Sequence, residues 1–293
     1  MTEYLYPNSI EEALDLLHSG SGQTRIIAGG TDVLPDIRKG KITPKNLIDI
    51  TRIPGLDQIE IMEDHVKVGA AVTFAEIKDH HYLQEHVHVL VEAARSVGTP
   101  AIQHAATWAG NIVQAMPAAD GAIAALTLEA EAYLVDNQGG KWHNVEDLFR
   151  GPGVSTVDPS QQIISHLRFP LPKTPWGTGW QRIGRRPSLV LPILNCAVKL
   201  VLDSECKSIT KARIALGPIA SVPTRAVRAE AALAGQKPTR ENFMLAAQIA
   251  KEDSHPRSSI NRASRAYRLT IIPTLVSQAL MIAANHVQTQ NPT

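Results

Sequence analysis

The residues best suited to bind a ligand lie in two short segments rich in glycine and threonine. The first, Ala28-Gly29-Gly30-Thr31-Asp32, follows the β-branched run Arg25–Ala28, a pattern typical of a buried strand that ends in a tight loop. Consecutive glycines turn backbone N–H groups toward one point, and their missing Cβ atoms let a phosphate approach the main chain. Thr31 adds a neutral donor, whereas Asp32 would repel a phosphate and is expected to brace the loop. The segment therefore predicts an anion-binding loop.

The second segment, Ala106–Ile112, again combines a threonine, small residues and an amide side chain. Two such loops are suited to holding the two phosphates of a dinucleotide. Neither loop matches G-x-G-x-x-G or G-x-x-x-x-G-K-[ST], so the Rossmann and P-loop mechanisms lose their main support. A Gly-Gly pair at a strand exit is most often only a turn. The prediction therefore depends on the two segments together.

Capping and periodicity signals predict the elements that position these segments. Ser9 with Glu12 forms a capping box before an apolar helical period that Gly20 ends, and Thr73 with Glu76 forms a second box. Periodicity predicts further strands and helices in the first half of the chain: strands at 25–28, 46–50, 65–70 and 131–135, helices at 84–97 and 118–128, and a turn at 137–140 that leads back toward Trp142.

A proline-dense stretch, 170–177, marks the best domain boundary, because each proline removes a ladder donor and biases the residue before it away from helix. The part that follows begins with strands and ends with alanine- and leucine-rich helices: strands at 194–202 and 208–216, helices at about 225–234, 239–252 and 260–286. Strands first and helices last indicate an α+β domain.

Composition narrows the functional classes. The chain has 293 residues, 44% of them hydrophobic, and a net charge of +1, which argues against a nucleic-acid or polybasic membrane surface. No stretch approaches the ~18 consecutive apolar residues of a membrane span, and no secretory signal is evident, so a cytoplasmic location is expected. Cys196 and Cys206 can form at most one bridge, and an iron–sulfur cluster needs about four thiolates. Metal chemistry is therefore expected only from partners.

In order and spacing, Ala28–Asp32 and Thr107–Asn111 resemble the paired FAD-binding motifs of one subunit type: the FAD-binding (medium) subunit of the xanthine dehydrogenase and carbon monoxide dehydrogenase family of molybdenum hydroxylases. The resemblance covers almost the whole chain. Further segments are similar to family landmarks: Tyr6-Pro7, Glu11–Ala13, Leu47–Ile50, Val68–Ala70, Phe149–Gly153, Ala212–Gly217 and Arg262–Arg268.

The resemblance implies an α+β fold in two parts. Residues 1–172 would form an FAD-binding PCMH-type domain, like that of vanillyl-alcohol-oxidase-like flavoproteins, with α+β subdomains at about 1–53 and 54–172. Residues 178–288 would form a C-terminal α+β domain of the CO dehydrogenase flavoprotein type.

The resemblance also implies one non-covalent FAD and the residues that bind it. Main-chain groups of the two segments would cradle the pyrophosphate: Ile26, Ile27, Ala28, Gly29, Gly30, Thr31 and Asp32 in the first, Thr107, Ala109, Gly110 and Asn111 in the second. Asp120 would hydrogen-bond ribityl hydroxyls, Ile163 would lie against the isoalloxazine, and Arg182 near its pyrimidine end would raise the flavin potential. The alternatives are a helix cap for Asp120 and a solvated strand arginine for Arg182. No catalytic or metal-binding residue is assigned.

The sequence departs from the family pattern at three places: Ala109 replaces the first of two glycines, Gln103-His104 replaces a basic-polar pair, and Val190 replaces an aspartate. Some relatives carry a cysteine-rich insertion for an additional iron–sulfur cluster, but the stretch from Asn111 to Leu128 has no cysteine, which excludes that cluster here. Two minor alternatives are a metal site at His81, Glu85 and His88, where a solvated helix face is favoured, and a covalent flavin on His104.

The implied function is electron transfer in a multi-subunit enzyme. Electrons from a partner's molybdenum centre would pass through [2Fe-2S] clusters to FAD here and then to an external acceptor such as NAD+. Molybdopterin and [2Fe-2S] clusters are expected only in partners, a large molybdopterin-binding subunit and a small [2Fe-2S] subunit, arranged as a dimer of heterotrimers. The alternatives are a stand-alone flavin-dependent oxidoreductase of the same fold and a scaffold that has lost FAD.

Overall fold

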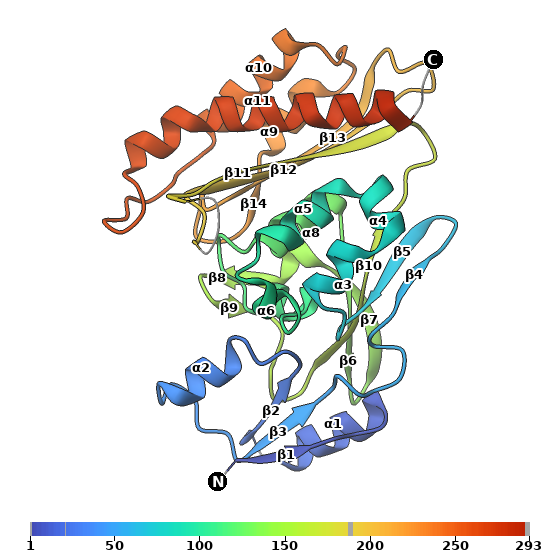
Figure 1. Ribbon diagram of the computed structural model, residues 1–293, viewed down its shortest axis with the longest axis vertical. Coiled ribbons are helices and arrows are strands. Elements are labelled where there is room, and N and C mark those ends of the chain that lie inside the picture. The colour runs from blue at the N-terminus through green and yellow to red at the C-terminus, as the bar shows by residue number, and fades with distance from the viewer. Residues whose placement is uncertain (1, 21, 187–189, 291–293) are drawn as a thin grey trace.

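The three larger of four sheets follow one another along the long axis of the computed structural model, which describes residues 2–20, 22–186 and 190–290 (Figure 1). The first sheet is parallel, in the order β1-β3-β2, and lies nearest the N-terminus: β1 (Glu3–Leu5), β3 (Asn46–Asp49) and β2 (Thr24–Ile27). Helix α1 (Ile10–Ser19) packs beside it and is capped as predicted, since Ser9 Oγ accepts from Glu12 N at 3.2 Å. Parallel strands bring their carboxyl ends to one edge, so the loop after β2 opens there.

The middle sheet is antiparallel, in the order β4-β5-β10-β6-β7: β4 (Ile59–Ile61), β5 (His65–Gly69), β10 (Ile163–Pro170), β6 (Glu131–Asp136) and β7 (Gly139–Asn144). The predicted turn at 137–140 joins β6 to β7. A group of helices lies between this sheet and the third (Figure 1): α3 (Phe74–Asp79), α4 (His81–His86), α5 (His88–Ser96), α6 (Pro100–Gln103), α7 (Trp108–Val113) and α8 (Asp120–Leu128). Short elements follow β7: η1 (Val145–Leu148), β8 (Phe149–Gly151) and β9 (Val154–Ser155).

The prediction of one helix over 84–97 is wrong, because the chain breaks at Val87 into α4 and α5. Val87 has φ −127° and ψ 51°, outside the helical region, and its side chain is fully buried. The backbone N–H of Val89, at the start of α5, donates to Thr178 Oγ1 of a distant strand at 3.1 Å. A tertiary contact therefore supplies the N-terminal partner that the local sequence lacks.

The third sheet is antiparallel, in the order β11-β12-β13-β14: β11 (Trp176–Ile183), β12 (Leu194–Leu202), β13 (Ile209–Gly217) and β14 (Thr224–Arg225). Three helices cover its outer face, and α5 and α8 lie against the inner one (Figure 1): α9 (Val227–Leu233), α10 (Arg240–Glu252) and α11 (Arg265–Gln290). Every residue of β12 is buried because both faces are covered. Strand β11 begins inside the stretch 170–177, and Cys196 and Cys206 are both free thiols.

Helix α11 is long and apolar enough, by length and composition alone, to cross a membrane. Its apolar side packs on β11 at very short range. A Cβ on Gly177 would lie 2.3 Å from the Ala283 carbonyl oxygen, and one on Gly179 would lie 2.0 Å from that of Ala279. The two glycines therefore let the helix backbone rest directly on the strand, which accounts for the apolar face. The helix begins at Arg265, later than predicted, because Ser259 N donates to Ala263 O and closes a loop before it.

Candidate functional site

The two glycine segments pack against each other where Gly29 meets Ala105, 76 positions later in the chain. A Cβ on Gly29 would lie only 1.7 Å from the Ala105 carbonyl oxygen, so no larger residue fits without moving backbone. Gly30 has φ +68°, in the region that favours glycine, and its carbonyl accepts from Leu34 N at 3.0 Å. The chain thereby turns directly from β2 into α2 (Val33–Arg38).

The second segment begins helix α7. Thr107 is the N-cap, and its Oγ1 accepts from Gly110 N at 3.1 Å. Asn111 Oδ1 accepts from Ala122 N at 3.2 Å and so joins α7 to α8. Ala109 is 4% exposed. The Thr107 hydroxyl and the Asn111 carbonyl thus order the segment.

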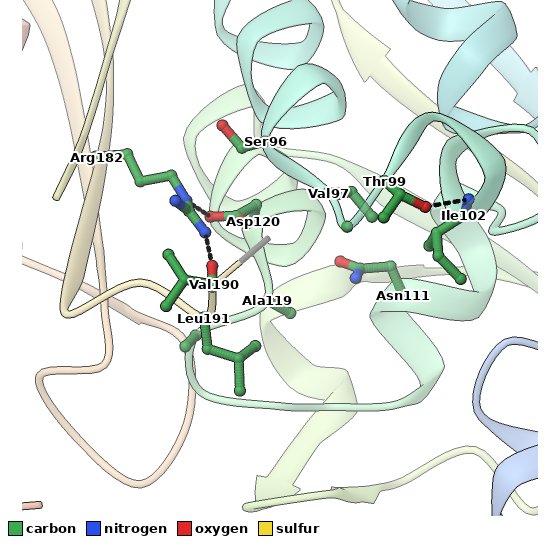
Figure 2. A pocket seen from close by; sticks show the side chains of 12 residues that line it. Ser96, Val97, Thr99, Ile102, Asn111, Ala119, Asp120, Arg182, Val190 and Leu191 are labelled. Carbon is green, nitrogen blue, oxygen red and sulfur yellow. Dashed lines mark hydrogen bonds and ion pairs between the residues drawn. The ribbon is translucent and has the colours of Figure 1, made fainter. Parts of the chain in front are cut away.

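A cavity of about 360 Å³ lies beside the second segment, between the helices and the third sheet (Figure 2). Three of the predicted site residues line it: Asn111, Asp120 and Arg182. The rest of the lining comes from the loop after α5, from the start of α8 and from the segment before β12: Ser96, Val97, Gly98, Thr99, Ile102, Ala118, Ala119, Val190 and Leu191. The cavity is therefore closed jointly by the first and second halves of the chain.

Asp120 and Arg182 contact each other at the wall of this cavity (Figure 2), with Arg182 Nε 3.4 Å from Asp120 Oδ1. The Arg182 guanidinium also donates to the Val190 carbonyl. The Arg182 side chain is 12% exposed, so the alternative of a solvated strand arginine is wrong. Burial raises the pKa of Asp120 to about 6, although Arg182 and a hydrogen bond from Asn195 oppose that rise. Asp120 is the first residue of α8 and makes no capping hydrogen bond.

Asn195 is a site residue that the sequence analysis missed. Its Nδ2 donates to Asp120 Oδ1 at 2.6 Å, and the residue is fully buried in β12. The available signal was an amide at the start of the otherwise apolar run 194–198, because a buried polar side chain requires a partner. Gln103 is a second buried amide, and its Nε2 donates to the Arg95 and Val97 carbonyls, which fixes the loop that lines the cavity.

Other predicted residues lie away from the cavity. Ile163 is 1% exposed, lies in the core of the middle sheet and pairs with Val135, so the structure does not bring it to the cavity. His81 lies 3.4 Å from Glu85 on the surface, whereas the ring of His88 stacks on His286 at 3.9 Å. Within 2–20, 22–186 and 190–290, no group of three or more His, Cys, Asp or Glu side chains is arranged to hold a metal ion.

The residues at the cavity fit a flavin dinucleotide. The cavity volume of about 360 Å³ lies at the lower end of the range for small-molecule sites. Arg182 Nε forms an ion pair with Asp120 Oδ1 at 3.4 Å but makes no hydrogen bond among the described residues, and a buried donor of this kind beside a cavity suits a polar ligand.

Fold and site together define a flavoprotein with an N-terminal FAD-binding unit and a C-terminal α+β unit. The chain belongs to the family described as the FAD binding domain in molybdopterin dehydrogenase, whose model matches residues 1–172. Residues 181–283 match the CO dehydrogenase flavoprotein C-terminal domain. These matches confirm the predicted family and the α+β fold, and they make the chain an FAD-binding subunit of a molybdenum hydroxylase, an oxidoreductase.

Relatives of known role agree with this assignment. The chain is 27% identical over 285 residues to the xanthine dehydrogenase FAD-binding subunit of Escherichia coli O157:H7, covering 96% of each chain. It is 29% identical over 244 residues to the nicotinate dehydrogenase FAD-subunit of Eubacterium barkeri, covering 82% of each. Among solved structures, carbon monoxide dehydrogenase from Hydrogenophaga pseudoflava matches with a TM-score of 0.89 at 26% identity, over 97% of this chain and 98% of that one.

Proposed function

We propose that this chain passes electrons from [2Fe-2S] clusters of a partner subunit to an external acceptor such as NAD+. Bound FAD supplies exchange between one-electron and two-electron carriers. The observation that carries the proposal is the cavity lined by Asp120 and Arg182 beside the second glycine segment, which in turn packs against the first. Among the described residues at this cavity, no arrangement of nucleophile and general base accompanies these groups, which favours electron transfer over a stand-alone reaction on an organic substrate.

All of the predicted residues except Ile163 have a role in this proposal. Main-chain groups of 26–32 and 107–111 hold the pyrophosphate, and Asp120 accepts hydrogen bonds from ribityl hydroxyls. Arg182 places a buried cation at the ring, where it stabilises added negative charge and raises the flavin potential. Val190 and Leu191, which line the cavity, supply apolar contact with the ring. The contact predicted for Ile163 stays a prediction.

The proposed assembly contains a large molybdopterin-binding subunit and a small [2Fe-2S] subunit, as a dimer of heterotrimers in the cytoplasm. The names of two relatives support a multi-subunit enzyme: the carbon monoxide dehydrogenase medium chain of Hydrogenophaga pseudoflava and a subunit of the 6-hydroxypseudooxynicotine dehydrogenase complex of Paenarthrobacter nicotinovorans. We place the domain boundaries at 1–172, with subdomains 1–53 and 54–172, and at 178–288.

Reconstitution tests the electron-transfer role. The complex with all subunits should bleach its flavin absorbance when the reducing substrate is added, and it should then reduce NAD+ or another acceptor. Omitting the [2Fe-2S] subunit should abolish the bleaching. Flavin reduction by an organic substrate in the isolated chain would contradict the proposal and favour the stand-alone oxidoreductase.

A glycine pair tests the phosphate loop. Gly30 and Gly40 both have φ +68°, but Gly40 has open space around its Cβ direction, whereas Gly30 lies in the proposed loop. Alanine at either site should destabilise the chain by about 1 kcal/mol through backbone strain. Only Gly30→Ala should also weaken FAD binding, measured by titration of the stripped chain. Equal FAD affinity in the two variants would reject the loop assignment.

A further inference from the structure

Asn195 approaches Asp120 from the other half of the chain. The two residues are 75 positions apart, on β12 and α8, and Nδ2 of Asn195 lies 2.6 Å from Oδ1 of Asp120. The same Nδ2 is 3.4 Å from the Ala118 carbonyl oxygen, so the amide spans the start of α8. Because Asn195 is fully buried, its side chain has no water with which to exchange this partner.

The two oxygens of the Asp120 carboxylate have different surroundings. Oδ1 receives both protein contacts, from Asn195 Nδ2 at 2.6 Å and from Arg182 Nε at 3.4 Å. Both of these contacts with described residues go through Oδ1 and neither goes through Oδ2, and Asp120 lines the cavity. A carboxylate held through one oxygen keeps the lone pairs of the other for a ligand.

We infer that Asn195 is a positioning residue for the cofactor, because its amide holds Asp120 through Oδ1 and leaves Oδ2 to accept hydrogen bonds from ligand hydroxyls in the cavity. The inference rests on the proposed role of Asp120 in FAD binding. It assigns a cofactor function to a side chain of the C-terminal unit that does not itself line the cavity.

Asn195 also favours the charged form of Asp120. Burial raises the pKa of Asp120, and the Asn195 hydrogen bond opposes that rise because a donor stabilises the carboxylate. A charged carboxylate accepts stronger hydrogen bonds from hydroxyls than its neutral form does. Loss of the Asn195 donor should therefore weaken FAD binding and move its pH dependence upward.

The test is the dissociation constant of FAD for the stripped full chain, measured by flavin fluorescence from about pH 5 to about pH 8, a window that contains the titration of Asp120. Asn195→Leu removes the amide with little change in shape. It should weaken binding about tenfold and raise the pH midpoint by about one unit, as expected for a hydrogen bond to a charged group. If the leucine variant does not fold, Asn195→Ala carries the same expectation.

A double-mutant cycle separates positioning from general packing. In an Asp120→Asn background, Asn195→Leu should change FAD affinity by less than about twofold, because its target is already altered. Thr178→Val is the control, since it removes a buried hydrogen bond from the same sheet to α5 away from the cavity. It should lower thermal stability without moving the pH midpoint.

Three results would overturn the inference. If Asn195→Leu keeps the wild-type FAD affinity and pH midpoint while Asp120→Asn binds FAD clearly more weakly, the role of Asn195 is rejected and that of Asp120 is not. Additive losses in the double variant would show that Asn195 acts independently of Asp120 and would also reject it. Wild-type affinity in Asp120→Asn at every pH would reject the proposed role of Asp120 itself, and the inference with it.

Discussion

Replacing Glu129 with glutamine should destabilise the full chain by about 3 kcal/mol at neutral pH. Glu129 follows α8 with φ +60° and meets three cations of the third sheet: Lys199 Nζ at 2.8 Å, Arg213 Nη2 at 2.9 Å and Lys211. Burial alone would raise its pKa, but attraction and hydrogen bonds from these cations lower the pKa from 4.5 to about 2. That difference corresponds to about 3 kcal/mol of favourable interaction with the ionised carboxylate.

The effect has a definite pH dependence. Because the folded-state pKa of Glu129 is lowered, its stabilisation is fully present above about pH 4.5 and is lost as the pH falls toward 2. Glutamine does not titrate, so the stability gap between the wild type and Glu129→Gln should close over the same window. The variant should therefore appear nearly as stable as the wild type only in strong acid.

Lys199 should respond differently from its partner. It is 1% exposed, and burial lowers its pKa even though Glu129 acts to raise it, so removal from water outweighs the attraction. Lys199→Met removes that buried charge, while Glu129 keeps Lys211 and Arg213. We expect a change within about 1 kcal/mol, because the two remaining cations keep Glu129 from becoming an unpaired buried charge.

Urea unfolding of the stripped chain, with and without FAD, measures these differences from the midpoint and slope. Glu131→Gln is the matched control, since its contact with Arg168 at 2.7 Å is about one-third exposed on both sides. An exposed pair of this kind contributes about 1 kcal/mol or less. A loss in Glu129→Gln no larger than that of the control would refute the reasoning. So would a Lys199→Met loss as large as that of Glu129→Gln.

Three further outcomes are expected. Arg182→Met should lower the two-electron potential of bound flavin by about 30 mV or more, since a buried cation is lost; an unchanged potential in a dye-equilibrated titration would contradict its placement at the ring. Gly179→Ala should cost about 1–3 kcal/mol in thermal or urea unfolding, because its Cβ would lie 2.0 Å from the Ala279 carbonyl oxygen; wild-type stability would contradict this close contact. The pKa of Asp120 is about 6 in the folded chain against 3.8 in the unfolded one, so the folded stripped chain keeps a proton that the unfolded chain loses, and the free energy of unfolding should fall by up to about 3 kcal/mol from pH 4 to pH 6. Asp120→Asn should remove this pH dependence of stability. A pH dependence that persists in the variant would assign it to another group.

Features that depend on only a few neighbouring residues could be predicted from the sequence. The capping box at Thr73 forms in full, whereas at Ser9 only the Ser9 side chain caps the helix, since Glu12 accepts from Asn8 N instead of Ser9 N. The hairpin at 137–140 and the glycine loop after β2 follow from local backbone preference in the same way. The resemblance to a known family then added predictions of the fold and the cofactor to these predictions of local structure.

Contacts between distant segments could not be predicted in this way. The break at Val87 depends on the hydroxyl of Thr178, and the state of Asp120 depends on Asn195. In both cases a polar group from the third sheet satisfies a residue of the helical layer, and no local pattern records that proximity. The sequence does contain the single clue of a polar residue in an apolar strand, but a partner can be assigned only once the strands are placed.

Helix α8 unites these observations, because carboxylates at both of its ends contact the third sheet. Asp120, at the N-terminal end, sits where the helix dipole favours negative charge, and its partners are Arg182 and Asn195. Glu129, at the other end, sits where the dipole disfavours a carboxylate, and three cations offset that cost. The helix between them is entirely buried. Excess FAD should restore part of the stability that Glu129→Gln loses, by preferential binding to the folded chain.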